Sequence, residues 1–275
     1  MKKIYFVILT AMLLVSCSEK SNKLTFRNYI YERFDADSIV QQLGELSRKT
    51  CENGAPIYYV GYDLEFPVTA VNDEVLRRLQ LNVISIVRQD VNLMSTDSQA
   101  EINRLFADMR LTEHDSCSVD PIQVSESEMN ITSRDFSAIR TITNTDSLYT
   151  LCLSTDCYAF GAAHGFYSLC YYSFNPATGN MLTFDSLFVE GAAAKFCDYM
   201  TRQIPIEYEE SYSEKFSFQS DPDVENGSFY FTADGVMFSF SPYAIGSFAD
   251  GQIDCLIPVS IAKPLLRKEW STLLK

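Results

Sequence analysis

The residues of this chain allow one possibility for catalysis, which is acid–base chemistry by a histidine. His164 is the fourth residue of the motif Gly161-Ala-Ala-His-Gly165, and an imidazole is the usual general base near neutral pH. Asp156 or Asp185 could orient its ring in an enzyme that acts on the cell wall or on glycans. In the alternative, structural interpretation, the two glycines let the backbone bend or approach a neighbour closely, and the ring fixes that bend through hydrogen bonds. The candidate binding or structural residues of this motif are Gly161, His164 and Gly165, and we assign no catalytic residue.

The sequence lacks the motifs of common hydrolases and nucleotide-binding enzymes. His114 is the other histidine, and neither His-Glu-x-x-His nor His-x-x-x-His occurs, so we expect no zinc site. Gly-x-Ser-x-Gly is absent, and so is Ser-x-x-Lys followed by Lys-Thr-Gly. No glycine-rich phosphate loop is present. We therefore expect a protein without a metal, a cofactor or enzymatic activity.

The N-terminus has the features of a bacterial lipoprotein. Lys2 and Lys3 precede an apolar segment over residues 4–15, which leads into Leu14-Val15-Ser16-Cys17. This pattern predicts a signal peptide over residues 1–16, lipidation of Cys17 and a tether over residues 17–23. The alternative is a free cysteine behind an ordinary signal peptide. No later stretch approaches the ~20 apolar residues of a membrane span, so we expect a protein held outside the cytoplasm by its N-terminal lipid, at the outer membrane or in the periplasm.

Acidic residues dominate the charge of the chain. The formal net charge is −14, and removing residues 1–16 takes away two lysines and no acid, which leaves 20 basic against 36 acidic residues, or −16. Such a surface repels nucleic acid, so we expect no nucleic-acid partner, and it attracts cationic partners in a salt-dependent way. The alternative is that the charge serves solubility alone.

The cysteines do not indicate a disulfide scaffold. Seven remain besides Cys17, so at least one thiol is free if pairing stays within the chain. No Cys-x-x-Cys occurs, and Cys152 and Cys157 lie too far apart along one predicted strand to form a bridge. We interpret most of them as small buried apolar residues.

Strands and helices are predicted in blocks. Alternating apolar residues predict strands over residues 24–34, 57–66, 135–143, 148–158, 167–174, 229–232, 236–240 and 253–259. Helical spacing predicts helices over residues 37–49, 72–87, 98–109 and 190–203, a short one capped by Asp185, and a last one from Ser260. Pro67 and Pro205 are expected to end the elements before them. Asn144-Thr145-Asp146-Ser147 and Ala233-Asp234-Gly235 are hairpin turn signals.

This order predicts an α+β fold, with antiparallel sheets and helices packed on one side. We expect two intimately packed sub-domains, an N-terminal one over residues 24–160 and a C-terminal one over residues 161–275 that carries the Gly-Ala-Ala-His-Gly motif.

A series of motifs in the second half resembles a known family. The motifs are Gly161-Ala-Ala-His-Gly165, Tyr172-Ser-Phe-Asn-Pro-Ala-Thr-Gly179, Leu182-Thr-Phe-Asp-Ser-Leu-Phe188, the segment from Phe229 through Asp234-Gly235 to Tyr243, and residues 253–259. Together they resemble the envelope domain of unknown function found in the ectodomain of RsiV-type anti-sigma factors and beside PdaC-type peptidoglycan deacetylases. Residues from about 57 through the helix after Asn72 resemble the domain that usually precedes it.

The resemblance implies an extracytoplasmic α+β module that binds rather than catalyses, and in the RsiV branch the ligand is lysozyme. It adds Asp185, Asp234, Gly235 and Tyr243 to the candidate binding or structural residues. Ala162 departs from the family, which usually has a second glycine there. The chain shows neither the transmembrane helix of the anti-sigma factors nor the histidine-rich deacetylase domain, so we expect neither activity. The ligand expected from this reasoning is a cationic, lysozyme-like protein or a cell-wall component; the alternatives are a hydrolase that uses His164 and a purely structural envelope lipoprotein.

Overall fold

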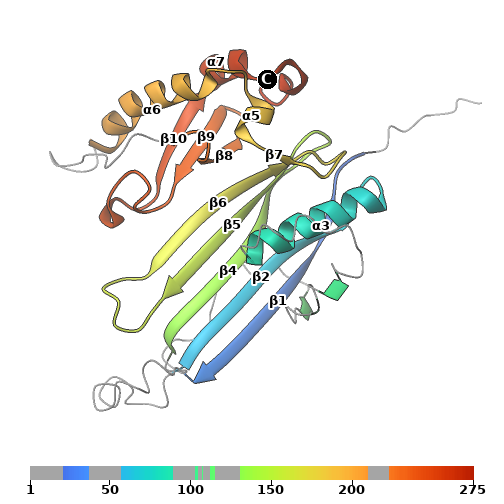
Figure 1. Cartoon of the computed structure of the whole chain (residues 1–275), viewed down its shortest axis with the longest axis vertical. Helices are drawn as coiled ribbons and strands as arrows, with labels where there is room; N and C mark the ends of the chain where they lie inside the picture. The colour runs from blue at the N-terminus through green and yellow to red at the C-terminus, as the bar shows by residue number, and fades with distance from the viewer. Residues whose placement is uncertain are drawn as a thin grey trace, which may run out of the picture.

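The protein contains a large and a small β-sheet. The computed structural model describes residues 21–36, 57–88, 131–209 and 223–275, with the short pieces 103–104, 107 and 112–114. In this part of the chain the large sheet has the strand order β3-β1-β2-β4-β5-β6-β7 and the small sheet the order β10-β9-β8 (Figure 1). The α+β class that we predicted from the sequence is confirmed.

Most neighbouring strands of the large sheet are antiparallel, as expected. Its strands are β1 (Thr25–Ala36), β2 (Ile57–Thr69), β3 (Thr112–His114), β4 (Ile131–Asn144), β5 (Tyr149–Tyr158), β6 (Phe166–Phe174) and β7 (Met181–Leu182). β2 and β4 are the exception, because they pair in parallel. A parallel pair needs a long crossover, which residues 70–130 supply. His114, which we expected in a loop, lies in β3, opposite Asn28 of β1.

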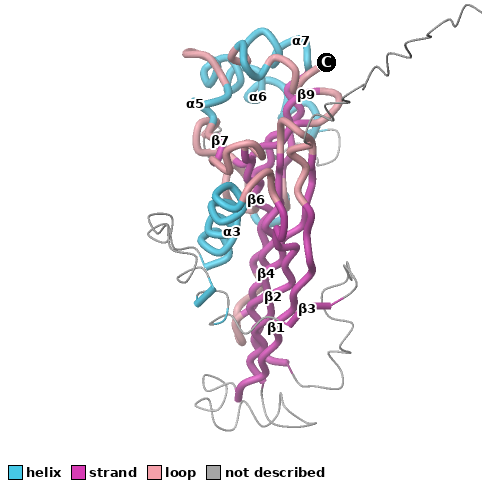
Figure 2. The backbone as a smooth tube through the Cα atoms, turned by 90° about the vertical axis from the view of Figure 1, so that its right-hand side faces the viewer, coloured by secondary structure: helices cyan, strands magenta, loops and turns pink. Residues whose placement is uncertain are grey.

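Helix α3 (Asp73–Arg88) covers one face of the large sheet (Figure 2). The side-chain oxygen of Asn72 accepts a hydrogen bond from the backbone N–H of Val75 at 2.9 Å, which is the predicted N-cap. The buried side chains of the helix form one hydrophobic core with Leu64, Ile139 and Leu151 of the sheet. The helix is fixed over the β6–β7 turn because Asn82 donates to the carbonyl of Gly179 at 3.1 Å.

The small sheet has a core of its own. It consists of β8 (Ser228–Phe231), β9 (Gly235–Phe240) and β10 (Ile253–Pro258), and its neighbours are α5 (Phe184–Leu187), α6 (Ala192–Glu209), α7 (Val259–Ala262) and the 3₁₀ turns Phe248–Asp250, Lys263–Leu265 and Lys268–Trp270. Phenylalanines from the helices and the strands fill this core. Phe196 of α6, for example, packs edge-on against Phe188 with ring centroids 5.1 Å apart.

Two prolines that we expected to end elements lie inside them. β2 continues through Pro67 to Thr69, and α6 continues through Pro205 to Glu209. A proline removes one N–H donor, which a strand tolerates at an irregular position. Inside a helix it removes one backbone hydrogen bond and crowds the preceding turn, so α6 continues past Pro205 at a local cost. β1 and β2 do change register close to Pro67, between the partners of Thr25 and Phe26.

The expected division between residues 160 and 161 falls between β5 and β6, which pair along the full length of β6. The boundary between the two hydrophobic cores lies about twenty residues later in the sequence. Met181 packs against the core under α3, whereas Leu182 belongs to the core of the small sheet.

Residues 1–20 lie outside the described residues, as does most of the helices expected over residues 37–49 and 98–109. The signal peptide, the lipidation of Cys17 and most of the tether therefore stay predictions. Within the described ranges, no helix is long and apolar enough to cross a membrane. Five cysteines are described, none of them in a disulfide, and two of them, Cys152 and Cys255, are buried.

The end of the tether is attached to the turn between β4 and β5. Ser21 Oγ and the backbone N–H of Asn22 both donate to Oδ1 of Asp146, each at 2.7 Å. One residue into the fold, the N–H of Leu24 donates to Oδ1 of Asn144 at 3.1 Å. The chain therefore enters the large sheet at this turn.

Candidate functional site

Four aromatic side chains from two distant segments meet in space. His164 lies in the loop between β5 and β6, Tyr167 in β6, and Tyr243 and Phe248 between β9 and β10. The rings of His164 and Phe248 stack with centroids 3.6 Å apart and planes at 14°. The ring centroids of Tyr243 and Tyr167 lie 5.7 and 6.2 Å from that of Phe248. We call these four residues the aromatic site.

His164 makes two hydrogen bonds that fix its tautomer. Its Nδ1 lies 2.8 Å from the carbonyl oxygen of Gly165, and because a carbonyl only accepts, Nδ1 carries the proton. In the neutral ring Nε2 is then an acceptor, and the hydroxyl of Tyr243 donates to it at 3.0 Å. The ring thus connects two loops, and the lone pair that a general base would use is already bonded to Tyr243.

The loop that carries His164 lies close against the strands beside it. A Cβ atom on Gly165 would lie 2.9 Å from the carbonyl oxygen of Cys157, which is closer than side chains tolerate, so this position needs a glycine. Gly161 adopts a φ of 83° at the turn. The backbone N–H of Phe160 donates to Oγ of Ser133 in β4 at 3.1 Å, which ties the loop to a third strand.

The loop that carries Tyr243 is held in place from inside. Ile245 is 2% exposed and belongs to the core of the small sheet. Asp250 Oδ2 accepts hydrogen bonds from both the N–H and the Oγ of Ser247, at 2.6 and 2.7 Å, so the 3₁₀ turn is capped. Within this frame Tyr243 has a φ of 71°, the only non-glycine residue of the described chain with a positive φ.

The other predicted site residues lie in different places. Asp185 is in the first turn of α5, whose N-cap is Thr183 rather than Asp185, because Thr183 Oγ1 accepts from the N–H of Ser186. The carbonyl of Asp185 accepts from Nε of Arg267 at 2.8 Å. Asp156 lies opposite Tyr167 in the sheet but forms an ion pair with Arg134. Among the described residues, no hydrogen bond joins His164 to Asp156 or Asp185.

Asp234 and Gly235 form the turn between β8 and β9, as the sequence predicted. The carbonyl of Asp234 accepts from the N–H of Val259 at 3.0 Å, so this turn packs on the end of β10. The structure therefore brings His164, Gly165 and Tyr243 together and leaves Asp185, Asp234 and Gly235 elsewhere. Phe248, which stacks on His164, was missed, because nothing in its local sequence distinguishes it from other loop aromatics.

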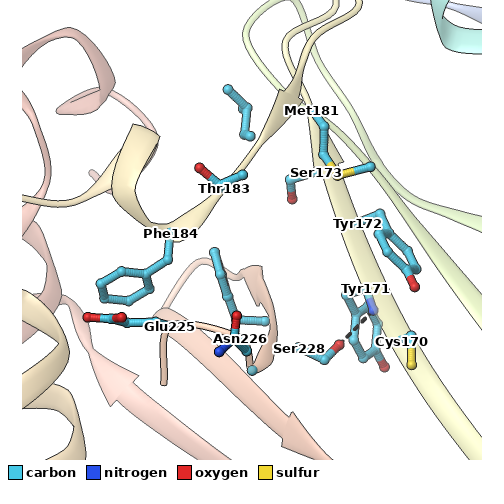
Figure 3. A pocket seen from close by; sticks show the side chains of 13 residues that line it. Cys170, Tyr171, Tyr172, Ser173, Met181, Thr183, Phe184, Glu225, Asn226 and Ser228 are labelled. Atoms are coloured by element: carbon cyan, nitrogen blue, oxygen red, sulfur yellow. Dashed lines mark hydrogen bonds between the residues drawn. The ribbon is translucent and has the colours of Figure 1, made fainter. Parts of the chain in front are cut away.

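A pocket lies between β6 and the segment before β8 (Figure 3). It is a pocket of about 220 Å³, with Cys170 to Ser173 on one wall, Glu225 to Phe229 on the other, and Met181 to Phe184 at one end. Burial raises the pKa of the Tyr172 hydroxyl to about 12 and also raises the pKa of the Cys170 thiol. Both groups are therefore neutral at physiological pH, and Glu225 is the acidic residue of the lining.

In the part of the chain that the structure describes, no three His, Cys, Asp or Glu side chains come together in a way that could hold a metal ion.

Comparisons with known proteins match part of the sequence and most of the fold. A family model described as "Protein of unknown function (DUF3298)" matches residues 185–260, which include Tyr243 and Phe248 but not His164. No curated protein matches the chain. A crystal structure of a DUF3298 family member from Bacteroides fragilis is similar over 91% of this chain and 97% of that chain, with a TM-score of 0.64 and 14% identity. One from Pseudomonas aeruginosa PAO1 has a TM-score of 0.46 and 13% identity, over 90% of this chain and 96% of that chain. The chain thus resembles a family of unknown function in residues 185–260 and shares its fold with the Bacteroides protein.

Proposed function

We propose that this protein is a binding module of the bacterial cell envelope, anchored by a lipid at Cys17, which recognises a cationic, lysozyme-like protein or a cell-wall component at the aromatic site. The observation that carries the proposal is the bridge through His164 and Phe248. Tyr243 and Tyr167 both lie against the Phe248 ring while they remain 51% and 39% exposed. Exposed tyrosines held in fixed positions are typical of recognition surfaces, because a large rigid ring loses little conformational entropy on binding.

Backbone strain at Tyr243 supports this proposal. A bulky residue with a φ of 71° costs about 1–3 kcal/mol relative to an unstrained conformation. A glycine would avoid that cost, and the tyrosine side chain does not repay it by burial, since half of its surface is exposed. A binding role for the ring gives the strain a physical reason.

Net charge favours a cationic protein as the ligand. The chain has a formal charge of −14, and long-range attraction between opposite charges raises association rates at low ionic strength. The same surface would repel anionic wall polymers.

The position of the anchor leaves the aromatic site accessible. Cys17 precedes Ser21 by four residues, and at ~3.6 Å per residue a lipid on Cys17 would lie within about 15 Å of the β4–β5 turn. The aromatic site lies at the other end of β5, whose ten residues span about 30 Å. A ligand would therefore approach from the side away from the membrane.

Titration calorimetry with a chicken-type lysozyme at low salt tests the proposal. We expect saturable heat that weakens as salt is added. Tyr243→Ala should weaken binding by about thirtyfold, the loss of a hot-spot ring worth ~2 kcal/mol. Tyr243→Phe keeps the ring and loses the hydrogen bond to His164, so we expect a smaller loss of about fivefold.

Ile142→Ala is the matched control, because Ile142 is 44% exposed but lies at the anchor end of β4. It should bind like the wild type. Soluble peptidoglycan fragments form a second arm of the same experiment. Absence of heat with both ligands at micromolar concentrations, or equal losses in Tyr243→Ala and Ile142→Ala, would count against the aromatic site as the binding surface.

A further inference from the structure

Strand β6 has one open edge. On one side it pairs with β5 along its whole length, from Phe166 to Phe174. On the other side it pairs only through Ser173 and Phe174, with β7. Among the described strands, none pairs with the outer edge of residues 166–172.

The backbone groups on this edge can be assigned from their neighbours. The N–H of Asn175 donates to Asn180 across the β6–β7 turn, and the N–H of Tyr171 donates to Oγ of Ser228 at 2.6 Å. Because successive residues of a strand point their backbone groups to opposite sides, Tyr167 and Leu169 also direct their N–H and C=O groups outward. Neither has a backbone partner there among the described residues.

The open edge lacks the usual protection against pairing. Natural edge strands carry prolines, lysines or bulges that prevent another strand from adding. Residues 166–172 read Phe-Tyr-Ser-Leu-Cys-Tyr-Tyr, with no proline and no charge, and they pair with β5 without a register shift. An uncharged, aromatic-rich edge of this kind is favourable for the addition of a strand.

The small sheet lies beside this edge without closing it. Tyr171 of β6 and Tyr230 of β8 stack with ring centroids 4.2 Å apart, but β6 and β8 belong to different sheets. The pocket of about 220 Å³ lies between them, beside Cys170 to Ser173 of β6 (Figure 3). Glu225 on its wall is an exposed acidic residue.

We propose that β6 is a β-augmentation site: an extended segment of a cationic partner protein adds as a strand to the edge at Tyr167 and Leu169, and a lysine or arginine of that segment reaches Glu225 in the pocket. The backbone of the edge supplies affinity, and the pocket supplies selection for a basic side chain. A cationic partner fits better than a second copy of this chain, because two copies of charge −14 repel each other. Tyr167 belongs to both sites, with its ring in the aromatic site and its backbone on the open edge. The proposal uses only the backbone and does not require a ligand at the aromatic site.

Residue-resolved amide hydrogen exchange on the whole chain tests this proposal. The probe is a synthetic octapeptide of alternating lysine and valine with blocked ends. In the free protein we expect fast exchange at Tyr167 and Leu169 and slow exchange at Ser168 and Cys170, which bond to β5. Saturating peptide should slow Tyr167 and Leu169 by about tenfold or more. A fully N-methylated form of the peptide, with the same charges but no N–H donors, should not.

Variants distinguish the contribution of the backbone hydrogen bonds to peptide binding from that of the charge. Leu169→Pro removes an outward N–H and no bond to β5, so the fold should persist while the peptide no longer protects Tyr167. Glu225→Gln should weaken the binding of the lysine peptide, and a glutamate–valine peptide should bind the wild type poorly. Tyr243→Ala should leave the effect of the lysine peptide unchanged, which distinguishes this edge from the aromatic site.

Three outcomes would overturn the proposal. The first is no slowing at Tyr167 and Leu169 with millimolar lysine peptide, and the second is equal slowing by the N-methylated peptide. The third is protection of both amides before any peptide is added, which would mean that the edge is already paired: by a second copy if the protection depends on protein concentration, or within the chain if it does not.

Discussion

Among the described glycines, Gly235 has the closest backbone neighbour. It starts β9 with a φ of 153°, and a Cβ atom there would lie 2.0 Å from the carbonyl oxygen of Ile257. That carbonyl belongs to the neighbouring strand β10 and cannot move without breaking the small sheet. The glycine of the Asp234-Gly235 turn therefore allows β10 to approach as well as the turn to form.

We predict that Gly235→Ala lowers the free energy of unfolding by about 3 kcal/mol or more, because strained dihedrals and a backbone clash add. Chemical denaturation followed by circular dichroism measures this loss. Gly191→Ala is the control: Gly191 has a φ of 79°, but a Cβ there would meet no atom within 4 Å. It should cost only about 1 kcal/mol. Equal losses in the two variants would show that φ alone, and not the contact with Ile257, decides the effect.

The aromatic site could be predicted only in part from its residues. His164 and Tyr243 stood out because they belong to recognisable motifs, but they are 79 positions apart, and no local signal indicates that they are bonded. The contribution of Phe248 is a tertiary stack, which has no sequence pattern. The positive φ of Tyr243 is imposed by the capped turn and the buried Ile245 beside it, so tyrosine's own preferences would have predicted the opposite.

At the level of elements, the attachment of the tether to the β4–β5 turn has a pH dependence. The hydroxyl of Ser21 and then the N–H of Asn22 stabilise the ionised form of Asp146 and lower the pKa of its carboxyl group below the ordinary 3.8. A carboxyl whose pKa is lower in the folded chain stabilises the fold above its unfolded pKa, and this contribution is lost as the pH falls through the folded pKa.

We therefore predict that Asp146→Ala lowers the thermal midpoint at pH 7, and that its difference from the wild type shrinks once the pH is well below 3.8. Midpoints measured from pH 7 down to acid conditions test this. Ser147→Ala, an exposed change in the same turn, should follow the wild type throughout. A difference between Asp146→Ala and the wild type that stays constant with pH would mean that the charge of Asp146 contributes nothing.

Local sequence signals predicted the helices, strands and turns, but they could not predict which distant strands pair. The Asn72 cap, the apolar stripe of α3 and the turns at residues 144–148 and 232–235 depend on neighbours within a few positions, and all are present. The parallel pairing of β2 with β4 joins strands separated by more than sixty residues, and nothing in either strand specifies it. The prolines misled because Pro67 and Pro205 were judged by propensity alone, whereas β2 and α6 both continue past them.

At the scale of the whole molecule, two separate hydrophobic cores raise the question of whether they unfold together. One lies between α3 and the large sheet, and the other lies around the small sheet and α6. The described contacts between the sheets include the stack of Tyr171 on Tyr230 and the bond from Tyr171 to Ser228. These contacts are small beside the cores, so we expect the two parts to open with different free energies.

The labelling of two buried cysteine thiols can measure the opening of each core separately. Cys152 lies in the large sheet and Cys255 in the small one, and neither is in a disulfide. Burial raises the pKa of the Cys152 thiol to about 11, so this thiol is protonated and unreactive at neutral pH until the structure around it opens. Labelling by an alkylating reagent, followed by mass spectrometry of the separate peptides, gives an opening rate for each part.

We predict that Phe196→Ala, which empties a fully buried position in the core of the small sheet, speeds the labelling of Cys255 by about a hundredfold or more, since such truncations cost ~3–5 kcal/mol. Cys152 should respond at least about tenfold less. Leu79→Ala, at a fully buried position of α3, is the reciprocal variant and should affect Cys152 more than Cys255. If each variant accelerates both thiols equally, the two cores form one cooperative unit, and the contacts through Tyr171 and the aromatic site couple the sheets far more strongly than their size suggests.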